Sequence, residues 1–135
     1  AAGDIIRVAY DDSKLIDAIE SVVVASAPVA GVVFDGVASD AVDAPLRIVT
    51  GLAHSAASST LMMAASFATD AATTEIFTVA NANVYVVDSS KAGRDDYVSA
   101  TTFGSVIGLQ QNAASVSKVS VYLSDGVVQS IVIFK

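Results

Sequence analysis

The chain has 135 residues, of which 53% are hydrophobic and only 16% are charged, and its formal net charge is −7. This length fits one folded unit with one core, so we expect a single domain over residues 1–135. The few basic residues are scattered along the chain and cannot neutralise a nucleic-acid backbone, so we expect no nucleic-acid partner. The chain has no cysteine, which excludes disulfides, thiolate nucleophiles and cysteine-based metal sites.

The apolar composition predicts self-association. The mean hydropathy is +0.62, and a folded chain of this mass would expose on the order of 6,600 Å² of surface. The 21 formally charged side chains cover that area sparsely. A chain of this kind gains by burying part of its surface against other copies of itself.

The N-terminal part predicts a strand followed by a helix. Residues 5–10 are rich in β-branched and aromatic side chains, which favours a strand. Ser13 is suited to cap a helix, and Leu15, Ile16 and Ile19 follow with Val22 and Val23 at the spacing of one helical face. Proline at position 28 limits the C-terminal extent of this predicted helix.

The middle of the chain predicts further strands. Asp35-Gly36 lies between residues 32–34 and 37–38 and predicts a hairpin, and residues 46–49 predict another strand. Residues 55–72 fit two interpretations: their alanine content favours a helix, whereas alternating apolar residues over 61–67 fit a strand. Residues 75–79 and 83–87 predict a third hairpin across 80–82.

The C-terminal end predicts a hairpin with Asp125-Gly126 as its two-residue turn. Polar and apolar residues alternate over 118–123, and residues 127–134 continue as a strand. Direct counting from the turn predicts a core face from four cross-strand pairs: Leu123 with Val128, Val121 with Ser130, Val119 with Val132, and Ser117 with Phe134. The same register places Gln129, Ile131 and Ile133 on the opposite face, where we expect a subunit contact.

Together these elements predict an α+β fold. It consists mostly of antiparallel β-sheet, with hairpins at Asp35-Gly36 and Asp125-Gly126 and one or two helices in a single domain.

Residues capable of catalysis are present, but no known catalytic spacing accompanies them. His54 is the only histidine and stands beside Ser55, without a nucleophile-elbow motif around it. Paired carboxylates occur at Asp11-Asp12 and Asp95-Asp96, where capping and loop roles explain them better than hydrolysis. We therefore expect no enzymatic activity and assign no catalytic residues.

Candidate ligand sites are similarly weak. Asp35, Asp40 and Asp43 gather in one segment but lack the spacing of a calcium-binding EF-hand loop, and zinc, copper and nucleotide motifs are absent, so we expect no metal and no cofactor. A cluster of Met62, Met63 and Phe67 is typical of core filling, with an apolar ligand pocket as the alternative.

These observations favour a structural function. We expect a self-assembling subunit of a larger assembly: a virion capsid, head-decoration or tail protein, or an extracellular filament. Its expected partners are copies of itself and other structural proteins, with no membrane partner, because the given chain shows no signal peptide and no transmembrane segment. The alternatives are a small ligand-binding module with an apolar pocket and, further behind, a small aspartate-dependent hydrolase.

Overall fold

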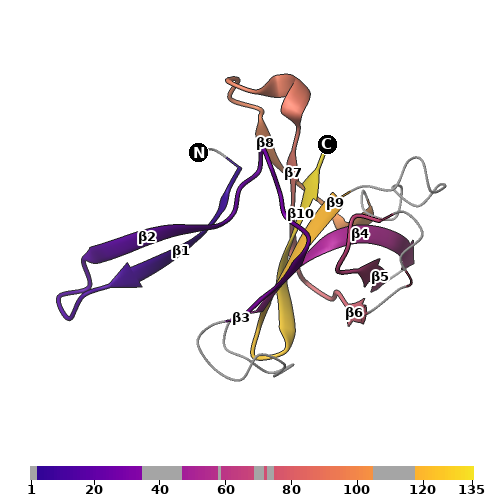
Figure 1. Ribbon diagram of the computed structural model, residues 1–135, viewed down its shortest axis with the longest axis horizontal. Helices are drawn as coiled ribbons and strands as arrows, with labels where there is room; N and C mark the ends of the chain where they lie inside the picture. The colour runs from indigo at the N-terminus through magenta and orange to yellow at the C-terminus, as the bar shows by residue number, and fades with distance from the viewer. Residues whose placement is uncertain (1–2, 35–46, 58, 69–71, 73–74, 105–117) are drawn as a thin grey trace.

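The computed structural model describes residues 3–34, 47–57, 59–68, 72, 75–104 and 118–135, which form ten strands. Two strands form a hairpin arm that extends away from the rest of the molecule, and the other eight belong to one curved sheet (Figure 1). The strand order in this sheet is β6-β5-β4-β9-β10-β7-β8, and β3 also pairs with β4. Neighbouring strands are antiparallel except β7 and β10, which are parallel.

The fold is a mixed β-sheet, so the predicted α+β class with one or two helices is wrong. The one helical element whose two ends both lie among the described residues is a 3-10 turn, η1 (Ser89–Lys91). The strands are β1 (Ile5–Tyr10), β2 (Ile16–Val23), β3 (Gly31–Phe34), β4 (Arg47–Ala57), β5 (Thr60–Ala64), β6 (Glu75–Thr78), β7 (Asn83–Val87), β8 (Val98–Thr101), β9 (Lys118–Ser124) and β10 (Val127–Phe134).

The segment predicted as a helix after Ser13 is strand β2, paired antiparallel with β1. A tight turn reverses the chain at residues 11–15: Oδ1 of Asp11 accepts hydrogen bonds from the backbone N–H groups of Ser13 and Leu15. Lys14 adopts a positive φ of 62°, which ends any helical path. The spacing of three between Ile16 and Ile19 imitates a helical face because the register of β2 shifts there by one residue, as in a β-bulge.

Strand β4 organises the sheet because it pairs with three other strands. Along one edge it pairs with β9, from Arg47 to Leu52. Along the other edge it pairs first with β3, up to Thr50, and then with β5, from Leu52 onward. Gly51 lies where β4 changes its pairing from β3 to β5. A Cβ atom there would collide with the backbone carbonyl of Ala64, so this crossing requires a residue without a side chain.

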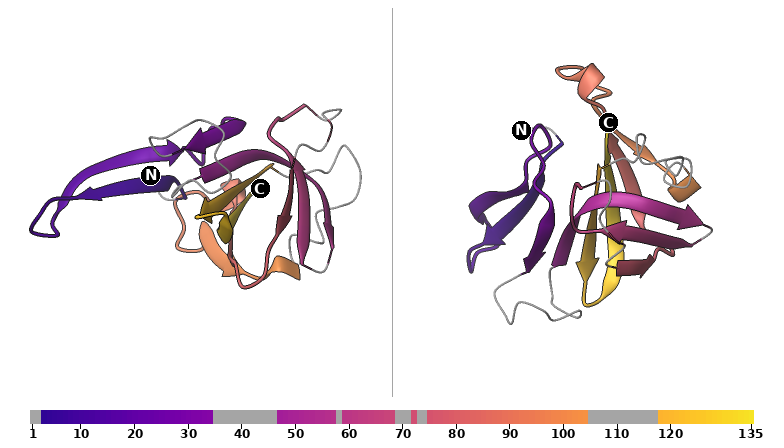
Figure 2. Two further views of the ribbon diagram at one scale, coloured as in Figure 1. Left: turned by 90° about the horizontal axis from the view of Figure 1, so that it is seen from below. Right: turned by 45° about the vertical axis from the view of Figure 1, so that its right-hand side comes forward.

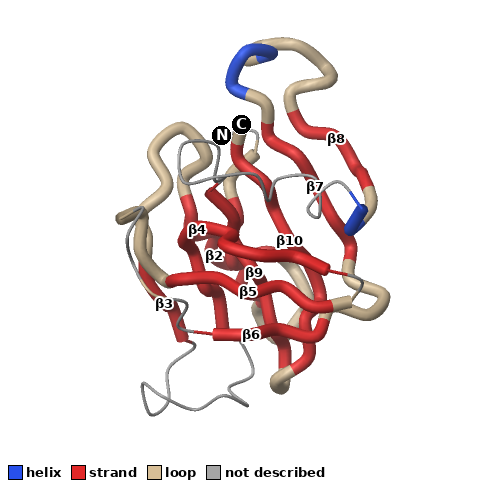
Figure 3. The backbone as a smooth tube through the Cα atoms, turned by 90° about the vertical axis from the view of Figure 1, so that its right-hand side faces the viewer, coloured by secondary structure: helices blue, strands red, loops and turns tan. Residues whose placement is uncertain are grey.

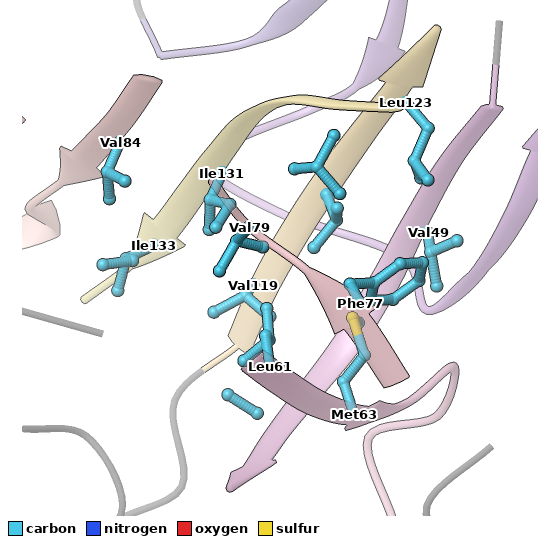
Figure 4. Close-up of a cluster of buried hydrophobic side chains, with 13 residues drawn as sticks. Val49, Leu61, Met63, Phe77, Val79, Val84, Val119, Leu123, Ile131 and Ile133 are labelled. Atoms are coloured by element: carbon cyan, nitrogen blue, oxygen red, sulfur yellow. The ribbon is translucent and has the colours of Figure 1, made fainter. Parts of the chain in front are cut away.

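The curved sheet encloses one hydrophobic core (Figure 4). Side chains of β5 and β6 pack in the same cluster as those of β9 and β10, although these strand pairs are separated by β4 in the sheet order. The sheet therefore curls over its own core, as seen from the side away from the arm in Figure 3. The buried cluster consists of Val49, Ala53, Leu61, Met63, Phe77, Val79, Val84, Val119, Val121, Leu123, Val128, Ile131 and Ile133.

The C-terminal hairpin forms at the predicted turn, but its predicted register is wrong. Asp125 and Gly126 both have positive φ, as a type I′ turn requires, and Leu123 pairs with Val128 as expected. The register then shifts by one residue at Gln129, so that Val121 pairs with Ile131 and Lys118 with Phe134. The shift brings Ile131 and Ile133 into the core, so these two side chains are not available for the predicted subunit contact.

Two other predicted hairpins also need correction or fall outside the described residues. Strands β6 and β7 form at the expected places, but β6 pairs with β5 whereas β7 pairs with β8 and β10. The turn at Asp35-Gly36 lies outside the described residues, and the strand before it, β3, pairs with β4. In the ambiguous stretch 55–72 the strand interpretation is correct for residues 55–57 and 60–64.

A buried hydroxyl pair joins β4 to β9. Thr50 Oγ1 and Ser120 Oγ lie 2.6 Å apart, and both residues are buried. We expect Ser120→Ala to lower the free energy of unfolding by about 1–2 kcal/mol, because the Thr50 hydroxyl would stay buried without its partner. Urea unfolding of Ser120→Ala, Thr50→Val and the double variant measures this. If the two single effects simply add, the hydroxyls are not coupled.

Candidate functional site

The residues with catalytic potential do not come together in the part of the chain that the structure describes. His54 lies at an irregularity of β4, where its Nε2 atom is buried and has no hydrogen-bond partner. The carboxylate of Asp11 accepts backbone hydrogen bonds within the turn at the tip of the arm. Asp96 lies in the loop between β7 and β8, whereas Asp35, Asp40 and Asp43 fall outside the described residues, as does the side chain of Ser55. No cluster of three metal-ligating side chains occurs among the described residues.

The β7–β8 loop contains a polar cluster with a structural role. Asp88 caps η1, and its Oδ1 atom accepts hydrogen bonds from the Ser90 hydroxyl and the Ser90 N–H. The Ser90 hydroxyl is the main cause that holds the pKa of Asp88 below its usual value. In the same loop, Asp96 forms ion pairs with Lys91 at 3.0 Å and Arg94 at 3.2 Å. These contacts stabilise the loop, and the carboxylates of Asp88 and Asp96 both take part in them.

A buried ion pair, which the sequence does not predict, joins the first residues of β4 and β6. Arg47 is buried, and its guanidinium donates to Oε1 of Glu75. The same guanidinium lies 5.9 Å from the centroid of the Phe77 ring. The pair spans β5 and holds β6 onto the curved sheet, which is a stabilising role. In sequence the two residues are 28 positions apart, so no local motif marks them.

The residues predicted as core filling or as a ligand pocket are dispersed. Met63 is completely buried in the core, and Met62 is half-buried on β5. Phe67 lies beneath the Lys118 ammonium group, with 4.4 Å between the Nζ atom and the ring centroid. Met63 therefore fills the core, and these three positions supply no evidence for a shared apolar pocket.

The arm presents an exposed apolar face. In the register of β1 and β2, Val8 lies opposite Ile19 and Tyr10 lies opposite Ile16. Val8 and Tyr10 are two residues apart on one strand and therefore share a face, together with Ile6. Of these, Ile6, Tyr10, Ile16 and Ile19 are between 49% and 65% exposed. The arm extends from the sheet in the ribbon views (Figures 1 and 2), and the exposed fractions of these four side chains make one of its faces an exposed apolar surface.

Exposed apolar side chains are concentrated in this part of the chain. Nine of the twelve large hydrophobic residues that are exposed among the described residues fall between positions 5 and 34. These nine residues are Ile6, Tyr10, Leu15, Ile16, Ile19, Val24, Val29, Val32 and Val33.

The base of the arm is fixed to the sheet. Oδ1 of Asp4 accepts a hydrogen bond of 2.9 Å from the N–H of Ala25, across the open end of the hairpin. Gly3 packs so closely on β7 that a Cβ atom there would lie 2.9 Å from Cγ1 of Val87. The arm therefore leaves the sheet in a defined direction, which a contact surface requires.

Comparison with known proteins identifies no relative: no family, no curated protein and no solved structure matches the chain. In the described part of the chain, no helix has the length and apolar character needed to cross a membrane.

Proposed function

We propose that this protein is a structural subunit that assembles with copies of itself, and that the apolar face of the β1–β2 arm is the assembly contact. The observation that carries the proposal is the position of that face: Ile6, Val8, Tyr10, Ile16 and Ile19 line one side of an arm that projects beyond the sheet. A hairpin that projects from its domain gains nothing from apolar side chains unless a partner covers them.

The magnitude of the contact fits a repeated assembly. Covering the arm face would bury on the order of 500 Å² on this side, compared with about 800 Å² per partner in a standard interface. At about 25 cal/mol/Å² this is worth roughly 12 kcal/mol, and the loss of translational and rotational freedom costs about 4–15 kcal/mol. One arm contact alone is therefore weak, whereas many copies joined by several such contacts form a stable assembly.

Within this proposal, the assembly class that suits the chain best is a virion component such as a capsid, head-decoration or tail protein. The acidic, cysteine-free composition supports an exterior or tail position over a lumen facing nucleic acid, because such a lumen requires clustered basic residues. Its partners would be other copies of the same chain and other structural proteins.

The test is the mass of the protein in solution by light scattering over a concentration series, with negative-stain imaging of the same samples. We expect the wild type to form rings, tubes, shells or a large closed oligomer. We expect Ile19→Asp to weaken association by about 100-fold or more, because it places a charge in the buried contact. The mass of this variant measured by light scattering should then be that of one chain, 13.7 kDa.

Ile76→Asp is the matched control, because Ile76 and Ile19 are both isoleucines in strands and both are 61% exposed. Ile76 lies on β6, at the end of the sheet, so its substitution should leave assembly intact. A wild type that stays monomeric at every concentration contradicts the proposed function. Disassembly by Ile76→Asp but not by Ile19→Asp would move the contact from the arm to β6.

A further inference from the structure

A hollow of about 400 Å³ lies at the base of the arm. It is lined by Ala25, Ser26 and Pro28 from the segment that follows β2, and by Phe134 at the end of β10. The remaining lining residues are Ser89, Lys118 and Lys135. The hollow thus combines apolar surface from Ala25, Pro28 and Phe134 with two ammonium groups.

Two ammonium groups line the hollow in a protein that is acidic overall, and Lys135 also interacts electrostatically with the Asp88 carboxylate. No described carboxylate side chain lines it, and neither Lys118 nor Lys135 forms an ion pair with a described residue. Both lysines are exposed. The Nζ atom of Lys118 rests over the Phe67 ring, which holds this charge in place beside the hollow. A ligand with a negative charge and an apolar side chain would complement this surface.

The tip of the arm has those two properties. Residues 4–23, which form the whole arm, carry five acidic and two basic side chains, a net charge of −3, and at the tip itself Asp11 and Asp12 outnumber Lys14. At the tip, Leu15 is 66% exposed next to the turn, and Asp12 is exposed and forms no ion pair with a described residue. The hydrogen bonds of Asp11 hold the turn in one conformation, so the tip is already shaped before it binds.

Apolar side chains are also exposed next to the hollow, as they are on the arm face. Val24 and Val29 flank the lining segment in sequence, and both are exposed. An arm that enters the hollow with its tip would place apolar side chains close to these valines.

We propose that the tip of the β1–β2 arm of one copy binds in the hollow at the base of the arm of the next copy, with Leu15 against Phe134 and Pro28 and Asp12 beside Lys118. This inference rests on the proposed function and specifies its geometry. The tip and the hollow are different surfaces, so the contact is head-to-tail, and repetition generates a ring or a filament. Because the eight residues of β2 span about 26 Å, a copy cannot place its own tip in its own hollow.

Disulfide trapping tests this contact directly, since the chain contains no cysteine that could interfere. The variant with both Leu15→Cys and Ser26→Cys should form a ladder of dimers, trimers and longer species on a non-reducing gel. A disulfide needs Cα atoms within about 7 Å, so these two positions at opposite ends of the arm cannot join within one chain. Each single variant should give no species larger than a dimer, and mixing the two should give the mixed dimer.

Charge reversal tests the same contact without covalent trapping. We expect Asp12→Lys and Lys118→Glu each to weaken association by about 10-fold, and the double variant to return to within about threefold of the wild type. Asp95→Lys is the control, because Asp95 is an exposed aspartate of the other acidic pair, in the β7–β8 loop away from the tip. It should leave association unchanged.

The outcomes separate this inference from the proposed function. If Ile19→Asp abolishes assembly but the double-cysteine variant forms no ladder and charge reversal has no effect, the arm is a contact but the hollow is not its receptor. If the double-cysteine ladder forms and charge reversal is rescued, the head-to-tail geometry is supported. If the wild type does not assemble, both proposals fail.

Discussion

Gly51→Ala is expected to lower the free energy of unfolding by roughly 3 kcal/mol or more, a large share of the stability of a small domain. A Cβ atom at this position would collide with the carbonyl oxygen of Ala64 and lie 2.7 Å from its carbonyl carbon and 3.0 Å from the Ala65 Cα. These are backbone atoms, so relief requires β4 and β5 to move apart. Urea unfolding at a concentration where both proteins are monomeric measures the loss.

Gly104→Ala provides the comparison for Gly51→Ala. Among the described residues, a Cβ atom at Gly104 would meet only the Thr102 hydroxyl at 3.5 Å, which is an ordinary contact. Its effect should stay within about 0.5 kcal/mol. Elsewhere, replacing glycine by alanine commonly stabilises a protein by about 0.4–1 kcal/mol through the unfolded chain. A stable Gly51→Ala variant would therefore contradict the close approach of β4 and β5.

Ile131→Ala should lower the free energy of unfolding by about 2–5 kcal/mol, because it removes buried methyl and methylene groups and leaves a cavity. Ile131 is completely buried on β10, between β9 and β7 in the sheet. Its side chain belongs to the cluster that includes Val119 and Leu61 (Figure 4). Chemical denaturation followed by circular dichroism measures the change in midpoint.

Ile76→Ala is the control for the same chemical change on the surface. Ile76 is 61% exposed on β6, so the truncation should cost about 0.5 kcal/mol or less. Equal losses for the two variants would contradict the placement of Ile131 in the core. They would then favour the unshifted hairpin register, in which Ile131 faces away from it.

The strands were largely predictable from local sequence. Alternation and β-branched composition over residues 5–10 and 118–123 correspond to β1 and β9, and Asp125-Gly126 forms the turn that its two residues favour. Local sequence failed where a register shift disturbs the alternation. The extra residue at Asp17 made β2 resemble a helix, and the one at Gln129 reversed the predicted faces of β10.

The candidate site was only partly accessible from sequence. The apolar composition predicted self-association, which the proposed function retains, but the predicted contact face on β10 is part of the core. The arm is missed because the spacing of Leu15, Ile16 and Ile19 predicts a helix at this position. A run of apolar residues in an otherwise acidic hairpin is the signal that marks it, once the segment is known to be a strand.

The sequence by itself determined that this chain is rich in strands, lacks cysteine chemistry, and has many hydrophobic residues with few charged ones. These properties depend on composition and on neighbouring residues. Only the tertiary structure decided which strands pair, that β7 and β10 are parallel, and that residues 5–23 project as an arm. The physical reason is that strand pairing joins residues far apart in the chain. It is decided by the packing of the whole core around β4 and Gly51, which no local pattern encodes.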